Sequence, residues 1–303
     1  MTGSLHTEDL RRSVRHDVGS SARTGAPPLG HLSGLHRTAS DSHSFVLAFD
    51  LDRPALIGGP GLLEVTMLAD LALGGAIRNY VGLATPMPTL SMSILLAQGR
   101  AQDVAWANGE CTTTVAGAAT SRSRLYTSTG EVVGDAQGLF ALPALPYEGP
   151  GRPMPWDTDR PPVESVPDGE EPLGEKELFV DQIAEHAASA PSRAWGLAYA
   201  EAQMTMIGEK PAMTPTALMV NRLGHVQGGS LLTAAVLAAS AERGVPVRAL
   251  VSTTIEFIDA ATVDEPVVSV VNIHRTSRRS LFASVTLVQD GRTCCHVTTI
   301  FRH

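Results

Sequence analysis

An acidic residue inside a predicted apolar helix, and a glycine pair at the start of another, are the residues best placed to do chemistry. Asp70 follows Leu63 and Met67 at helical spacing on a face that a helix would bury, so its carboxylate needs a partner or a function. Gly228 and Gly229 precede a run that is apolar on almost every side, as in a buried helix. The first amides of such a helix can hold an anion, or an oxygen that becomes anionic during a reaction.

The elements that would position these residues occur twice in the same order. In the first half, the patterns predict a strand over 45–49, a helix over 62–80, and strands over 89–96, 104–118, 123–127 and 131–142. In the second half, they predict a helix over 176–188, strands over 198–207 and 213–220, the buried helix, and strands over 249–258, 266–274, 281–289 and 293–301. Asp290-Gly291 predicts a tight hairpin turn. This order indicates an internal duplication.

An antiparallel sheet wrapped around a long central helix, present twice, is the α+β architecture called a double hotdog. The predicted repeats are residues 31–142 and 178–303. Residues 1–30 lack apolar periodicity and are predicted to be a disordered leader. Residues 143–177 hold 9 of the 20 prolines, together with several acids, and are predicted to be an extended linker.

Composition excludes several classes of function. The 303 residues, 43% of them hydrophobic, can bury a substantial core. The net charge of -8, without a basic stripe, argues against nucleic acid as a partner, and no apolar run is long enough for a membrane span. Cys111, Cys294 and Cys295 form no disulfide framework, and no spacing of ligands indicates a metal or a cofactor. We therefore expect a soluble cytoplasmic protein.

The stretch from Asn221 to Gly229 resembles the acyl-CoA thioesterases of the phenylacetyl-CoA (PaaI-like) branch. Their pattern is an Asn, a Gly, and then His-Gly-Gly at the start of the central helix, with a catalytic Asp nine residues after the His. Here Gln227 occupies the His position and Val236 occupies the Asp position. The second half on its own would therefore carry only part of the family's site.

The first half carries the complementary part. Residues 68–76, which include Asp70, resemble the family's helix segment around its catalytic Asp, whereas the preceding turn lacks the Asn and the His. In this family the site lies between two hotdog units, with the turn from one and the acid from the other. The resemblance therefore implies one composite site, and the symmetry-related site would be inactive.

The resemblance implies hydrolysis of an acyl-CoA thioester and suggests a role for each residue. An amide of Gly228 or Gly229 would stabilise the oxyanion, and Asp70 would act as general base or nucleophile. Asn221 would position water or the substrate carbonyl, although it could equally be a turn former. Gln227 can donate a hydrogen bond as the family's His does, but it cannot exchange a proton near neutral pH.

Further residues are candidates for binding the substrate. Thr89 and Ser91 lie on the strand after the predicted Asp70 helix and could contact the thioester. Arg275, Arg278 and Arg279 form the densest basic cluster, and family members hold the phosphates of CoA with basic residues near the sheet edge. The alternative for these arginines is a solvated hairpin end.

Glu64 is the rival acid in the first half. It lies about 120° from Asp70 around the predicted helix, so the two carboxylates should not point into one site. As an acid in the first turn, Glu64 is favoured by the helix dipole. His225 and His296 have no spacing that suggests a role.

Two other functions compete with hydrolysis. The residues 60–64 resemble the helix start of hotdog dehydratases or hydratases that act on hydroxyacyl thioesters, but the Gly-His-Phe-Pro element of those enzymes is missing. A non-catalytic acyl-CoA-binding protein would explain Gln227 and Val236. Acyl-CoA is the expected partner if the chain is a thioesterase or a non-catalytic acyl-CoA-binding protein. A homo-oligomer of double hotdogs is compatible with the sequence.

Overall fold

The computed structural model describes residues 11–12, 14–16, 28–42, 44–82, 87–143, 177–190, 192–221 and 223–302. Most of the predicted leader and nearly all of the predicted linker lie outside these residues. Within the described ranges, no helix is both long enough and apolar enough to cross a membrane.

The helices and strands follow the predicted duplication. The first half contains α2 (Pro28–Leu32), β1 (His36–Ser40), β2 (Ser44–Ala48), α3 (Leu62–Val81), β3 (Thr89–Leu96), β4 (Trp106–Val115), β5 (Ala118–Tyr126) and β6 (Val132–Ala141). The second half contains α4 (Glu177–Ser189), α5 (Trp195–Ala202), β7 (Met204–Ile207), β8 (Lys210–Met213), α6 (Gly228–Arg243), β9 (Leu250–Phe257), β10 (Val267–Thr276), β11 (Ser280–Gln289) and β12 (Arg292–Arg302). Short 3-10 turns occur at Pro54–Leu56, Ala101–Asp103, Ala217–Met219 and Val247–Ala249.

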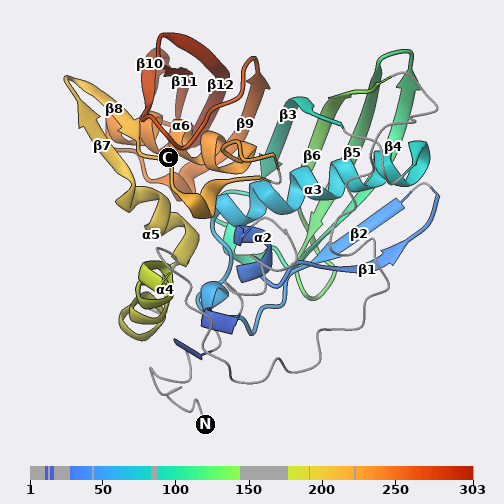
Figure 1. Ribbon diagram of the computed structural model, residues 1–303. Coiled ribbons are helices and arrows are strands. Elements are labelled where there is room, and N and C mark those ends of the chain that lie inside the picture. The colour runs from blue at the N-terminus through green and yellow to red at the C-terminus, as the bar shows by residue number, and fades with distance from the viewer. Residues whose placement is uncertain are drawn as a thin grey trace.

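The strands form one 12-stranded antiparallel sheet, and the two halves of the sheet have the same strand order when each is followed from its outer edge to the centre. The order is β1-β2-β4-β5-β6-β3-β9-β12-β11-β10-β8-β7, so each strand of the first half has its counterpart at the same distance from the centre (Figure 1). The predicted double hotdog is confirmed. Its two sheets join edge to edge at the β3–β9 seam, where Ser91 lies opposite Glu256 and Ser93 lies opposite Thr254.

Irregularities of the sheet are repeated as well. Three register shifts of the first half, in the pairs β3–β6, β4–β5 and β5–β6, recur in the counterpart pairs β9–β12, β10–β11 and β11–β12, whereas a fourth, between β1 and β2, does not recur between β7 and β8. The residues skipped at the shared shifts are Leu90, Thr112 and Val133 in the first half and Val251, His274 and Cys294 in the second. The shared bulges allow the two copies to be aligned residue by residue, although their sequence identity is low.

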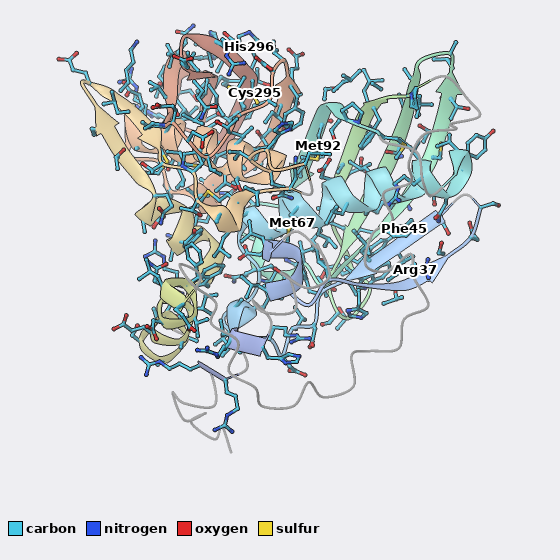
Figure 2. The ribbon with its side chains drawn as sticks, viewed as in Figure 1. Arg37, Phe45, Met67, Met92, Cys295 and His296 are labelled. Atoms are coloured by element: carbon cyan, nitrogen blue, oxygen red, sulfur yellow. The ribbon has the colours of Figure 1, made fainter. Side chains whose placement is uncertain are left out.

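Helix α3 packs closely on the first half of the sheet because small residues face it. A Cβ added to Gly109 of β4 would lie 2.1 Å from the carbonyl oxygen of Ala72, so the helix backbone rests directly on that strand. A Cβ added to Gly75 would lie 2.3 Å from Cδ1 of Phe45, whose ring fills the space between α3 and β2 (Figure 2). This packing fixes how α3 lies on the sheet.

Two predicted strands in the second half were largely wrong. Of the strand predicted over 198–207, residues 198–202 belong to helix α5 and only Met204–Ile207 form a strand, β7. The helix is favoured because Trp195 and Tyr199 stack at helical spacing with ring centroids 4.9 Å apart. Strand β8 ends at Met213, and a 3-10 turn over Ala217–Met219 replaces most of the predicted strand 213–220. Pro215 between them has no amide hydrogen for a ladder. Asp290 and Gly291 have φ values of 49° and 72°, which confirms the tight hairpin turn.

Candidate functional site

Asp70 is the ninth residue of α3, and its carboxylate is held by one hydroxyl. Oδ1 accepts a hydrogen bond of 2.9 Å from Oγ1 of Thr89, and the carboxylate forms no ion pair with the described residues. Burial raises the pKa of Asp70 to about 6, although the hydrogen bond from Thr89 opposes this rise. A half-buried carboxylate whose pKa is raised towards neutrality suits a general base.

Thr89 reaches Asp70 because of the register shift at the start of β3. Thr89 lies opposite Phe140, a buried residue under α3, and directly opposed residues share a face of the sheet. Ser91 lies beyond the shift, opposite Leu139, and lines a cavity of about 410 Å³ on the outer face of the sheet. The two hydroxyls predicted to act together therefore lie on opposite faces.

The glycine pair begins α6 where that helix meets α3. A Cβ added to Gly229 would lie 2.7 Å from Oγ1 of Thr66 and 3.3 Å from the amide nitrogen of Met67, one turn before Asp70. A Cβ added to Gly228 would lie 2.6 Å from Cζ of Phe257 at the end of β9. Both positions therefore require glycine, and they bring the amides at the start of α6 against the Asp70 helix.

Gln227 precedes the glycine pair as the N-cap residue of α6. Its side chain is only 6% exposed, and its Oε1 has no hydrogen-bond partner in the described part of the chain. Oε1 faces Gly229, because a Cβ added to that glycine would lie 3.4 Å from it. The hydroxyl of Ser230 is buried and without a partner as well. Buried polar groups of this kind are rare and suggest a bound water or ligand.

Asn221 holds the loop that leads into α6. Its Oδ1 accepts hydrogen bonds from the amides of Leu223 at 2.8 Å and His225 at 3.3 Å. Gly224 between them has a φ of 80°, in the left-handed region that favours glycine. The turn-forming role considered for Asn221 is therefore present, and its role in positioning water or substrate stays a prediction.

Glu64 is more deeply buried than its place in the first turn of α3 suggested. Its Oε2 accepts a hydrogen bond of 2.9 Å from the amide of Gly61, and a Cβ added to Gly196 of α5 would lie 1.8 Å from Oε1. Burial raises the pKa of Glu64 to about 7, against hydrogen bonds from backbone amides that lower it. These contacts give the carboxylate a structural role between α3 and α5.

The three arginines predicted to hold CoA phosphates lie far from the glycine pair. All three are exposed: Arg275 lies near the end of β10, and Arg278 and Arg279 lie in the turn between β10 and β11. Ser280, next to them, pairs with Arg302, at the end of the sheet where β9 begins. Gly228 contacts the opposite end of β9, roughly 25 Å away for a strand of this length. Binding of CoA by this cluster remains a prediction that this placement does not favour.

Comparison with known proteins finds similarity to thioesterases. Residues 216–302 match the family model described as acyl-CoA thioesterase N-terminal domain. The tesB protein of Mycobacterium avium subspecies paratuberculosis is similar in structure, with a TM-score of 0.51 and 11% identity over 95% of this chain and 99% of that protein. A protein assigned as an oleoyl thioesterase of Lactobacillus plantarum has a TM-score of 0.52 and 12% identity over 86% of this chain and 95% of its own.

The chain is a double hotdog. The family match covers the second hotdog unit alone, from the 3-10 turn before α6 to the end of β12, and relates that unit to the acyl-CoA thioesterases. It does not single out the phenylacetyl-CoA type. Among curated proteins, no sequence matches this chain.

Proposed function

We propose that this double hotdog is an acyl-CoA thioesterase with one composite hydrolytic site, made by α3 and β3 of the first unit and by the start of α6 of the second. The observation that carries the proposal is an asymmetry between the copies. The shared bulge makes Leu250 the counterpart of Thr89, and Val236, the ninth residue of α6, is the counterpart of Asp70. Both counterparts are apolar and buried, so only the first copy has an acid with a hydroxyl partner.

The amide donors show the opposite asymmetry. At the positions of Gly228 and Gly229, the first copy has Leu62 and Leu63, whose buried side chains occupy the helix start. Only the second copy therefore has no side chain of its own at its first helical amides. Each copy thus contributes one half of the proposed catalytic groups, as expected when two units share a single site.

The chemistry follows from the types of residue. Water attacks the thioester carbonyl carbon while Asp70 accepts a proton from it, and the amides at the start of α6 stabilise the developing oxyanion. The tetrahedral intermediate collapses by breaking the carbon–sulfur bond, which releases a carboxylic acid and the free thiol, and the thiolate takes up the proton held by Asp70. The side-chain amide of Gln227 supplies a further hydrogen bond without exchanging a proton.

A free-thiol assay over a panel of acyl-CoAs tests this function. We expect thiol release by the native chain and its loss in Asp70→Asn, which preserves size and hydrogen bonding but cannot act as a base. Hydration of an enoyl thioester without thiol release would instead indicate the dehydratase class. Tight binding of acyl-CoA with neither product would indicate a non-catalytic binding protein.

The finer expectations belong to the same proposal. The stretch from Asn221 to Gly229 favours the phenylacetyl-CoA type, and the repeats are proposed to span residues 31–142 and 178–303 in a cytoplasmic protein. Mass measurement in solution will decide whether such double hotdogs assemble further.

A further inference from the structure

A cavity of about 470 Å³ lies at the end of the seam opposite the Asp70 site. It is formed where β3 and β12 end and β9 begins. Its lining residues are Gln98, Gly99, Pro246, Arg248, Ala249 and Arg302. None of them is acidic, and the volume falls within the range of small-molecule pockets.

The two arginines of this cavity have no side-chain partner within the described part of the chain. Neither the Arg248 nor the Arg302 guanidinium forms an ion pair or a side-chain hydrogen bond with the described residues. The nearby acids Asp103 and Glu131 both bind Arg100, at 2.7 Å and 2.6 Å. Gln98 Nε2 donates a hydrogen bond of 2.8 Å to the carbonyl oxygen of Arg302 and so anchors the end of β12. In a chain of net charge -8, two free cations beside one cavity attract an anion.

The correspondence between the two copies shows that only this end of the β3–β9 seam carries the two arginines. Because Leu250 and Phe301 pair as Thr89 and Phe140 do, the counterparts of Arg248 and Arg302 in the first copy are Met87 and Ala141. The Asp70 end of the seam thus lacks both cations. The other end lacks the acid and its hydroxyl partner.

We propose that this cavity is a binding site for a phosphate or diphosphate group, separate from the hydrolytic centre. The planar guanidinium groups of Arg248 and Arg302 bind phosphate oxygens through paired hydrogen bonds. The turn that carries Arg278 and Arg279 lies at the same end of the sheet, since Ser280 pairs with Arg302, and adds positive potential there. The ligand is inorganic phosphate or pyrophosphate, or the diphosphate of a nucleotide. The proposal holds whether or not the chain hydrolyses thioesters.

Isothermal titration of the full chain with phosphate, pyrophosphate and ADP tests the proposal. We expect at least one of the three to bind with a Kd of about 1 mM or tighter. Arg248→Gln/Arg302→Gln should weaken binding by about tenfold or more, and Arg248→Lys/Arg302→Lys by less, because charge remains without the planar fork. ADP binding more tightly than pyrophosphate would identify a nucleotide as the source.

The matched control is Arg37→Gln/Lys210→Gln, which removes the same charge from β1 and β8, near the two outer edges of the sheet and away from the cavity. It should bind like the native chain, and circular dichroism will establish that all variants are folded. Absence of binding by the native chain, equal affinity in Arg248→Gln/Arg302→Gln, or an equal loss in the control would each overturn the proposal. A KM for acyl-CoA raised by about tenfold in Arg248→Gln/Arg302→Gln would show that the arginines serve the hydrolytic centre instead.

Discussion

The hydroxyl of Thr89 and the carboxylate of Asp70 form a hydrogen bond of 2.9 Å that joins the bulge of β3 to the middle of α3. The second copy repeats the bulge and the helix but places two buried aliphatic side chains, Leu250 and Val236, at the same positions. The framework of the site is thus duplicated while its polar pair is not. The predictions below use this pair and the packing that holds it.

Removing the Thr89 hydroxyl should change the pH dependence of hydrolysis. The hydrogen bond lowers the pKa of Asp70 from the value that burial alone would produce, so Thr89→Val should raise that pKa above about 6. Because the base must be ionised, the acidic limb of the kcat profile should move to higher pH. The loss of a hydrogen bond to a charged group should reduce the rate below pH 6 by about tenfold or more. Thr89→Ser keeps the hydroxyl and should leave the profile in place; an unmoved limb in Thr89→Val would contradict the role of the pair.

Truncating Gln227 should lower the rate of the chemical step. If its amide acts only on the transition state, Gln227→Ala should reduce kcat by about 10²-fold with little change in KM. Gln227→His restores the donor found in the family and should retain much more activity than the alanine variant. Steady-state kinetics of the two variants at one pH will decide, and a change confined to KM would assign Gln227 to substrate binding.

Two adjacent glycines of α3 should respond oppositely to alanine. Gly75→Ala places a Cβ 2.3 Å from the Phe45 ring, so the free energy of unfolding should fall by about 1–3 kcal/mol. Gly74→Ala places its Cβ 3.5 Å from Phe140, an ordinary contact, and should raise that free energy by up to about 1 kcal/mol through helix propensity. Urea denaturation measures both. Equal effects would mean that α3 does not rest on β2 as described.

Glu64 should make stability depend on pH near neutrality. Its pKa is raised from 4.5 to about 7, so the folded state retains a proton that the unfolded state has lost. The associated stability is complete below pH 4.5 and disappears as pH rises through about 7, a change of roughly 3 kcal/mol at most. Glu64→Gln should remove the part of this dependence that lies above about pH 6, where the raised pKa of Asp70 contributes little, and Glu209→Gln, at an exposed turn, should preserve it. Denaturation midpoints between pH 5 and pH 8 provide the measurement.

Much of this fold could be predicted from the sequence because its elements have strong local signals. The helix predicted over 62–80 is α3 at Leu62–Val81, and the four last strands are found within two residues of their predicted bounds. Residues 198–202 were wrongly predicted as part of a strand because a short Ala-rich segment has no clear period, and the Trp195–Tyr199 stack that favours a helix involves a residue before that segment.

The site was only partly predictable for a physical reason. Asp70, Gln227 and the glycine pair have recognisable residue patterns, whereas the partnership of Thr89 with Asp70 depends on a register shift that no local pattern announces. The same limit applies to Arg248 and Arg302, which are separated by more than fifty residues and meet only because the first residues of β9 pair with the last of β12.

The β3–β9 seam ties the two hotdog units together by backbone hydrogen bonds within a single chain. A site assembled from separate subunits is lost as the protein is diluted, because the subunits dissociate. Here each unit meets its partner at a fixed effective concentration. The specific activity of the proposed enzyme should accordingly stay constant from concentrated stock to the lowest concentration that the assay can detect.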